Sequence, residues 1–551
     1  MTNFFINKFN SYSPPNFTPD QQKILLKYFT NVDKPVYAFT SNVPTEVAGA
    51  LISRFSRTNK SPRELFLEEF LKNPDLSLST EITNISVADD AAKERAGKFF
   101  QQVLAKYGDE SVAEITGVHL VIEKASLIAI KIIESMRRMA FIEQSTRYID
   151  LSGKVDGKYE YYRDEKLISL LGTKYEEYAD NLYEHFQLWF NDVKDHVKAQ
   201  NPMLETDTEI GYNQSIHSRT CDILRELLPL SLRSTVGIFG YGRDWSDLVS
   251  IMLAHDFEEV REIGKMILTE VSQMIPNIMD RVSGPHGKSN QEYLTKIDFK
   301  IQLTVNKHPS LLQNLSEFNQ NTIEARILEI SNFPLENIAA GMIYSHSAKE
   351  FNTLLEYFKI NPAITIDLIN QIQESRQNRF NKVPDGFEKV RMSVEFTAPW
   401  SCWKDIQRHR RLTEIHNNYF VNTNFYIAPE LFDLGLDKKY SKLMTETLNF
   451  IKTTKQNHPE IESLIEYLVP HGAEFRWIMD MDLAEAIYMM ELRSIPGGHM
   501  VYRKLMHAFY YELKKQNPAL SSLVKFIDLE NYYLGRRQSY NKVVAKGASL
   551  E

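Results

Sequence analysis

Three stretches of the chain occur twice, in the same order. The paired stretches are 43–56 with 334–347, the strand-then-helix part of 107–148 with 390–411, and 224–268 with 465–509. In the last pair, Pro229 aligns with Pro470 and Val260 with Val501. Repeats of this length indicate one domain duplicated head to tail, and 551 residues with 43% hydrophobic content suffice for two domains with cores of their own. The fold must therefore be one that two successive halves can both form.

The repeats also predict where the domains lie. We expect an N-terminal extension at 1–34, a first domain at 35–295 and a second, divergent domain at 296–551. Each domain is expected to be an α+β unit with a central antiparallel sheet flanked by helices. The two halves should pack as a pseudo-two-fold dimer that meets through 126–148 and 399–420.

The first copy shows most clearly how a strand leads into a helix. Apolar and polar residues alternate over 116–123, which indicates a strand with one buried face. Ser126 is a candidate N-cap, and apolar residues recur at helical spacing over 127–133. The helix is expected to end at Arg137 and Arg138.

A polar run, EQSTRY at 143–148, follows this helix. Ser145 and Arg147 could offer a hydroxyl and a forked guanidinium to one phosphate group. Arginine near a helix C-terminus is also favourable without any ligand, by about 0.3–1 kcal/mol through the helix dipole. A phosphate site and a purely structural helix end are both compatible with these residues.

Composition excludes several functional classes. A net charge of −8 argues against a protein whose main partner is nucleic acid. Cys221 and Cys402 are the only cysteines, which is too few for a disulfide framework or a cysteine zinc site and fits a reducing cytoplasm. No apolar stretch approaches the roughly 18–20 residues that cross a bilayer, and the N-terminus lacks the apolar core of a signal peptide. We expect a cytoplasmic protein with no metal site and no membrane or nucleic-acid partner.

A family resemblance rests on two motifs. The block GDESVAE at 108–114 is followed by R-x7-S-x-R-Y from Arg137 to Tyr148. This arrangement resembles the signature region of the flavin-dependent thymidylate synthases, whose motif is RHR-x7-S. The first copy has Ser-Met-Arg at 135–137 in place of RHR, and Asp109 in place of the family histidine, whereas the second copy carries RHR at 408–410.

The resemblance implies an activity and its ligands. The activity is reductive methylation of dUMP to dTMP, with methylenetetrahydrofolate as the one-carbon donor, FAD as the cofactor and NADPH as the reductant. The two copies keep complementary parts of the site, which implies that both build it. The implied dUMP-binding residues are Glu143, Ser145, Arg147, Arg225 and Arg493. The implied FAD-binding residues are Ser111, Glu114, Arg243, Arg408, His409 and Arg410. Arg493 is the implied catalytic group, because a guanidinium facing the uracil can stabilise negative charge that develops on the ring.

Two alternatives remain beside this enzyme. A catalytically silent nucleotide-binding or scaffolding paralogue would explain Asp109 and the missing first-half RHR. An RNA-binding protein could use the basic run at 408–411, although the acidic net charge disfavours it. Because members of the family are homotetramers, the resemblance implies a homodimer of fused chains for this protein.

Overall fold

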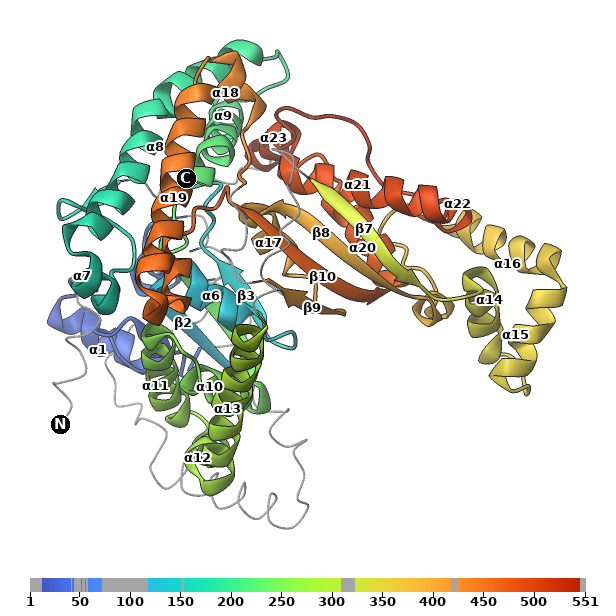
Figure 1. Ribbon diagram of the computed structural model, residues 1–551, viewed down its shortest axis with the longest axis horizontal. Helices are drawn as coiled ribbons and strands as arrows, with labels where there is room; N and C mark the ends of the chain where they lie inside the picture. The colour runs from blue at the N-terminus through green and yellow to red at the C-terminus, as the bar shows by residue number, and fades with distance from the viewer. Residues whose placement is uncertain are drawn as a thin grey trace.

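The computed structural model describes residues 12–40, 42–43, 51, 55, 58–71, 117–149, 153–308, 323–417 and 424–545. Its larger strands form two four-stranded sheets, and all pairings within them are antiparallel in the described residues. Figure 1 shows the two sheets next to each other in the middle of the molecule, with helices around them. The predicted α+β fold, with two tandem copies of an antiparallel sheet flanked by helices, is confirmed.

The two sheets have the same strand order. The first is β1–β2–β6–β3 and the second is β7–β8–β10–β9, so each early edge strand, central pair and late edge strand has a counterpart in the other half. The first-sheet strands are β1 (Val36–Ala38), β2 (Gly117–Ser126), β3 (Ala140–Glu143) and β6 (Arg233–Tyr241). The second-sheet strands are β7 (Glu324–Ile330), β8 (Arg391–Pro399), β9 (Leu412–His416) and β10 (Glu474–Asp482). A small hairpin pairs β4 (Lys154–Val155) with β5 (Lys158–Tyr159).

Helices cover both sheets and connect their strands. Those up to residue 307 are α1 (Pro19–Tyr28), α3 (Pro62–Leu65) with a π-helical turn (Phe66–Phe70), α6 (Leu127–Glu134), α7 (Glu165–Leu171), α8 (Thr173–Gln200), α9 (Glu209–Leu224), α10 (Gly242–Leu253), α11 (Glu258–Ser272), α12 (Pro276–Ser283) and α13 (Pro285–Lys307). The later ones are α14 (Pro334–Tyr344), α15 (Phe351–Ile360), α16 (Pro362–Ser375), α17 (Trp400–Ile406), α18 (Pro429–Asp433), α19 (Asp437–Asn457), α20 (Leu483–Arg493), α21 (Met500–Gln516), α22 (Pro518–Ser521) and α23 (Arg537–Ala545). Each helix in the described part of the chain is too short or too polar to span a bilayer.

The strand and helix predicted from 116–133 are present as β2 and α6. Ser126 caps α6, because its hydroxyl accepts a hydrogen bond from the Ala129 amide. The predicted helix end was wrong, since α6 stops at Glu134 rather than at Arg137 and Arg138. The chain turns over 136–139 so that β3 can pair with β6, and this long-range pairing ends the helix early.

The two halves meet about a pseudo-two-fold axis at Pro229 and Pro470, the two prolines that the repeat aligns. These prolines form an isolated antiparallel bridge. On either side, the Leu230 amide donates to the Val469 carbonyl at 2.8 Å, and the His471 amide donates to the Leu228 carbonyl at 2.9 Å. Because the repeat aligns the residues of one bond with those of the other, the two bonds are related as a two-fold axis requires.

The predicted contact between 126–148 and 399–420 is also present. The Gln407 side chain donates to the Lys131 carbonyl at 3.1 Å, and the Lys404 ammonium lies 3.2 Å from a Glu143 carboxylate oxygen. Farther from the sheets, α8 of the first half lies beside α19 of the second (Figure 1), where the Tyr178 and Phe450 rings stack. The predicted pseudo-two-fold packing of the halves is confirmed.

The boundaries of the first half differ from the predicted ones at both ends. Helix α1 lies on the outer face of the first sheet, and its Leu25 and Tyr28 belong to a buried cluster with Tyr37 and Val121. Part of the predicted extension at 1–34 therefore helps to form the core of the first half. The boundary predicted between 295 and 296 falls inside α13. The predicted helix at 91–106 lies outside the described residues, as does most of 43–56.

Glu226 is buried where the two halves join. One of its carboxylate oxygens accepts from the Ser401 hydroxyl at 2.7 Å, and its main-chain carbonyl accepts from the Gly472 amide. Among the described residues, the other carboxylate oxygen has no hydrogen-bond partner. Burial raises the pKa of Glu226 to about 7, against the opposing effect of the neighbouring Arg225.

Replacing Ser126 with alanine should destabilise the protein. The change removes the cap of α6 and the hydroxyl that donates to Glu259 at 2.6 Å, which should lower the free energy of unfolding by about 1–2 kcal/mol. Urea denaturation followed by circular dichroism measures the loss. Ser135→Ala, at the exposed end of the same helix, is the control and should change it by less than about 0.5 kcal/mol. Equal losses would contradict this role of Ser126.

The pH dependence of stability should change when Glu226 becomes glutamine. Because the folded protein holds this proton more tightly than the unfolded chain, the stabilisation is present below pH 4.5 and is lost as pH rises through 7. Relative to the native protein, Glu226→Gln should therefore gain stability between pH 5 and pH 8, by up to about 1.4 kcal/mol per unit of pKa difference. Urea denaturation at both pH values tests this, with Glu446→Gln on the exposed side of α19 as control. A pH-independent difference would contradict it.

Candidate functional site

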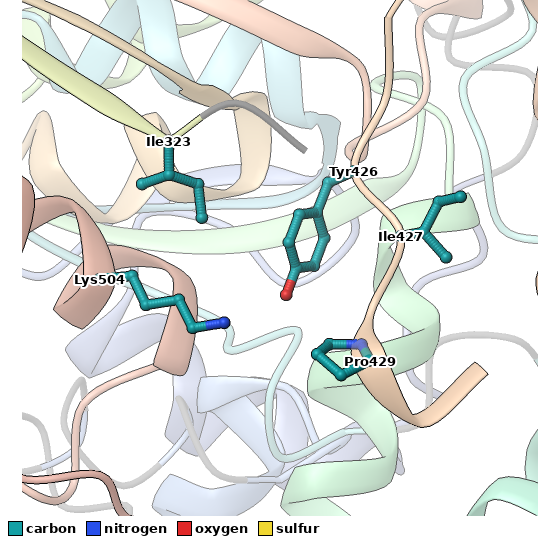
Figure 2. A pocket seen from close by; sticks show the side chains of 5 residues that line it. All are labelled: Ile323, Tyr426, Ile427, Pro429 and Lys504. Carbon is teal, nitrogen blue, oxygen red and sulfur yellow. The ribbon is translucent and has the colours of Figure 1, made fainter. Parts of the chain in front are cut away.

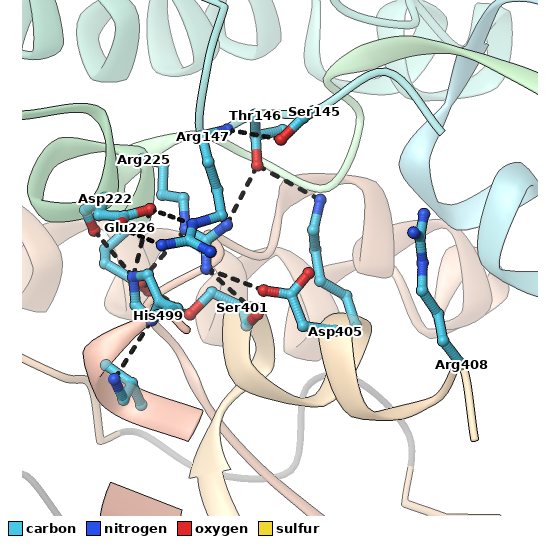
Figure 3. Close-up of polar contacts among 12 residues, drawn as sticks. Ser145, Thr146, Arg147, Asp222, Arg225, Glu226, Ser401, Asp405, Arg408 and His499 are labelled. Carbon is cyan, nitrogen blue, oxygen red and sulfur yellow. Dashed lines mark hydrogen bonds and ion pairs between the residues drawn. The ribbon is translucent and has the colours of Figure 1, made fainter. Parts of the chain in front are cut away.

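Several of the predicted site residues lie on one side of the pseudo-two-fold axis. The loop 144–148 follows β3, the turn at 225–227 follows α9, and both face α17 of the second half (Figure 3). The first half thus contributes a loop and a helix end, and the second half contributes a helix.

Arg147 forms a bidentate ion pair with Asp222. Its Nε and Nη2 donate to the two carboxylate oxygens, both at 2.7 Å, and both side chains are buried. Burial alone would raise the pKa of Asp222, but the Arg147 guanidinium keeps that pKa at about 2. His499 lies on the other side of Asp222, and burial lowers the pKa of its imidazole to about 3. His499 is therefore neutral near pH 7, and Arg147 is the cation that neutralises Asp222.

Arg225 is completely buried but only loosely bound. Its Nη1 donates to the Thr146 hydroxyl at 3.2 Å, while its Nη2 lies 3.5 Å from both the Ser401 carbonyl and an Asp405 carboxylate oxygen. Its Nε has no hydrogen-bond partner among the described residues. A buried guanidinium with long contacts and a spare donor is suited to an anionic ligand.

Glu143 joins the two halves electrostatically. Lys131 of α6 and Lys404 of α17, which the repeat aligns with each other, approach its two carboxylate oxygens at 2.8 and 3.2 Å. Burial would raise the pKa of Glu143, but the two lysines and Arg408 hold that pKa well below its usual range. Glu143, predicted to bind substrate, is thus the centre of an ion-pair network beside the site.

The RHR residues follow the end of α17. His409 is buried, and its imidazole connects Glu485 at 2.6 Å with Arg493 at 2.9 Å. Arg410 is exposed and donates to the Met139 carbonyl at 3.1 Å. Tertiary structure therefore brings His409 and the predicted catalytic group, Arg493, into direct contact.

The remaining predicted residues make fewer or longer contacts, or lie outside the described residues. Arg408 is partly exposed, with a guanidinium nitrogen 3.5 Å from Glu143. Ser145 is half-buried, and its hydroxyl accepts from the Arg147 amide at 3.2 Å. Arg243 lies in the first turn of α10. Ser111 and Glu114 lie outside the described residues.

The opposite side of the pseudo-two-fold axis lacks this set of charges. By the repeat, Ser463 and Glu466 stand for Asp222 and Arg225. The equivalents of Ser401, Asp405 and Arg408 are Ile128, Ile132 and Ser135. The equivalent of Arg147 is Phe420, which lies outside the described residues. Within the described part of the chain, Glu466 is the one charged residue among these counterparts, so the cluster of Asp222, Arg225, Asp405 and Arg408 is present on one side of the axis only.

Sequence reasoning missed the carboxylates of the site. Asp222 precedes Arg225 by three positions, as Asp405 precedes Arg408, so the pattern D-I-x-R occurs at the C-terminal ends of both α9 and α17. In a helix that spacing puts the acid and the arginine on one face, and it was the available signal. No comparable local signal marks Glu485, which is 76 residues from His409.

A separate cavity of about 300 Å³ lies in the second half (Figure 2). Its lining residues are Ile323, Tyr426, Ile427, Pro429 and Lys504. The predicted site residues do not line it. The guanidinium groups of Arg147, Arg225 and Arg408 lie apart from this cavity, where the two halves join.

Comparisons with known proteins identify the family. The family described as "Thymidylate synthase complementing protein" matches residues 71–277 and 338–519, one segment in each half. A UPF0159 protein of Chlamydia pneumoniae is 29% identical, with the match covering 94% of this chain and 97% of the relative. A UPF0159 protein of Thermoplasma acidophilum is 26% identical, covering 89% and 96%.

Two solved structures are also similar, each over 37% of this chain. One is thymidylate synthase X of Helicobacter pylori with FAD and dUMP, at 12% identity and a TM-score of 0.28, covering 37% of this chain and 100% of that one. The other is the UMP/dUMP methylase PolB of Streptomyces cacaoi with 5-bromo-dUMP, at 12% identity and a TM-score of 0.29, covering 37% and 95%. The two family segments, one in each half of a chain with two sheets of equal topology, show that this protein belongs to the flavin-dependent thymidylate synthase (ThyX) family in an internally duplicated form.

Proposed function

We propose that this protein catalyses FAD-dependent reductive methylation of dUMP to dTMP, at one site per chain that both halves build. Methylenetetrahydrofolate would be the one-carbon donor and NADPH the reductant. Family membership supports the reaction class. The observation that carries the proposal is that the first half contacts α17 and the RHR segment that follows it across a single interface: Arg225 lies 3.5 Å from Asp405, and Glu143 lies 3.5 Å from Arg408.

The phosphate of dUMP would bind at Arg147, Arg225 and Ser145. Arg225 supports this assignment most directly, because its buried Nε lacks a hydrogen-bond partner among the described residues. A hydrogen bond from a guanidinium to an ionised phosphate contributes about 1.5–3 kcal/mol. Arg147 would turn part of its guanidinium from Asp222 toward the phosphate.

Arg493 would act at the uracil end of the substrate. As the ring carbon that receives the one-carbon unit becomes nucleophilic, negative charge develops on the ring, and a fixed guanidinium stabilises it. His409 accepts a hydrogen bond from the Arg493 Nε at 2.9 Å, which leaves the two terminal nitrogens to face a ligand. The chain thus holds the group in place before the substrate arrives.

The residues after α17 fit an anionic flavin cofactor. Arg408 and Arg410 present exposed guanidinium groups on either side of the buried His409, a donor set that suits the pyrophosphate of FAD. Arg243, Ser111 and Glu114 would complete the cofactor site. Reduced FAD would supply the hydride, while these side chains bind and orient it. A homodimer of fused chains would bring further surfaces to the site.

A catalytically silent nucleotide-binding or scaffolding paralogue is the second candidate. It is favoured by the ion pairs that Arg147 and Arg225 already make with Asp222 and Asp405. A phosphate entering the site would meet two carboxylates whose repulsion opposes binding, so these ion pairs favour the scaffolding role.

Flavin binding separates these two candidates. Purified protein reconstituted with FAD and passed through a desalting column should retain the visible flavin absorption bands. Arg408→Ala should lose them, because it removes a cation from the pyrophosphate site. Ser135→Ala, at the equivalent position of the first half, should retain them. Native protein that retains no flavin would favour the silent paralogue.

The phosphate site is tested by comparing dUMP with deoxyuridine. Arg147→Ala should weaken dUMP binding by about ten- to a hundredfold in isothermal titration calorimetry and leave deoxyuridine binding unchanged, since the lost donors contact only the phosphate. Arg147→Ala leaves Asp222 buried and unpaired, so Arg147→Ala/Asp222→Asn should be measured as well. Arg326→Ala, at an exposed ion pair on the second sheet, is the control. Unchanged dUMP affinity in both Arg147 variants would refute the assignment.

A further inference from the structure

His409 lies between two residues of one helix, Glu485 near the start of α20 and Arg493 at its end. Nδ1 of the imidazole is 2.6 Å from a Glu485 carboxylate oxygen, and Nε2 is 2.9 Å from the Arg493 Nε. A guanidinium can only donate hydrogen bonds, so Nε2 is the unprotonated nitrogen of the ring. The proton is therefore on Nδ1, which donates to Glu485.

Glu485 is itself rigidly placed. Its amide donates to the side chain of Asp482, the N-cap of α20, at 2.8 Å. The Glu485 side chain is buried, with only 5% of its surface exposed, and within the described ranges its carboxylate hydrogen-bonds to the His409 imidazole and interacts electrostatically with Arg411. The charged groups that face His409 are Glu485 and Arg493, and the Tyr488 ring packs edge-on against the imidazole.

We propose that Glu485 is a positioning residue for Arg493 and acts through His409. By accepting the Nδ1 proton, Glu485 selects the tautomer whose Nε2 can accept from Arg493. In the other tautomer, Nε2–H would oppose the Arg493 N–H, and the guanidinium would turn away from the place where it meets the ligand. The effect of Glu485 on catalysis rests on the function proposed above. The tautomer of His409 and its dependence on Glu485 are independent of that function.

The first half provides an internal comparison. By the repeat, Asp244, Met136 and Met252 occupy the positions of Glu485, His409 and Arg493. Asp244 forms an ion pair with Arg138, and Met252 is completely buried. Helix α10 thus forms without a carboxylate–imidazole–guanidinium chain. The chain of Glu485, His409 and Arg493 occurs in the half that carries RHR, which argues for a role in the site rather than in folding.

Nuclear magnetic resonance of the protein with ¹⁵N-labelled histidine tests the proposal, with His409→Gln to assign the signals. In the native protein the His409 shifts should report a proton on Nδ1. Glu485→Leu should move them toward the Nε2–H tautomer, while Glu485→Gln, which keeps an acceptor oxygen, should retain Nδ1–H. Asp244→Asn is the matched control from the first half and should leave the His409 signals in place. Unchanged shifts in Glu485→Leu, or the same change in Glu485→Gln, would overturn the proposal.

Steady-state kinetics of dTMP formation test whether Glu485 contributes to catalysis. Glu485→Leu should lower kcat for dTMP formation by on the order of a hundredfold, with a smaller effect on the KM for dUMP, and Glu485→Gln should restore most of it. A loss of kcat without a change in the His409 shifts would show a structural effect and overturn the positioning role.

If the native protein makes no dTMP, the proposed function fails, but the shifts still test the tautomer. If Glu485→Leu does not fold, the titration of His409 in Glu485→Gln provides the test. His409 should then titrate at lower pH than in the native protein, because the negative charge of Glu485 favours the imidazolium. An unchanged titration would overturn the proposal.

Discussion

Buried charges that find their partners in the opposite half hold this structure together. Arg225 is completely buried, and its carboxylate partner across the interface, Asp405, comes from α17. Glu143 is likewise neutralised by Lys404 from the other half. Removing one member of a buried ion pair costs roughly 3–5 kcal/mol, because the other charge is left without water or a counter-ion. Sliding one half along the other would leave several of these charges buried without their partners, so the charged cluster depends on the present register of the two halves.

Duplication explains why this arrangement can be asymmetric. In a dimer of identical chains, every substitution would appear on both sides of the two-fold axis. Fusion removes that constraint, so one side can keep Asp405 and Arg408 while the other has Ile132 and Ser135. Lys131 and Lys404 retain the symmetry, and both bind the single carboxylate of Glu143. The two interfaces have diverged in charge while the backbone symmetry at Pro229 and Pro470 has persisted.

The polar groups of the site differ in how firmly they are held. Arg147 uses two donors on Asp222 at 2.7 Å, whereas the contacts of Arg225 with Asp405 and Ser401 are 3.5 Å long. A ligand anion would gain most from Arg225, since it has a spare donor and would lose little when its present contacts rearrange. Arg493 is fixed in another way, through the neutral imidazole of His409. The cluster thus combines a loosely satisfied cation at one end with an oriented guanidinium at the other.

The sequence by itself determined the features that depend on neighbouring residues. The strand is indicated by the alternation of apolar and polar residues over 116–123, the helix start by the capping residue Ser126, and the alignment of Pro229 with Pro470 by the repeat. The family resemblance implied separate roles for His409 and Arg493, and their contact is a finding of the structure. Tertiary structure decided the end of α6, because β3 must turn to pair with β6. It also decided the partners of Arg147 and His409, since Asp222 and Glu485 lie 75 and 76 residues away along the chain. Whether a carboxylate is buried, and which cation neutralises it, depends on which segments pack together, and that is a property of the folded chain.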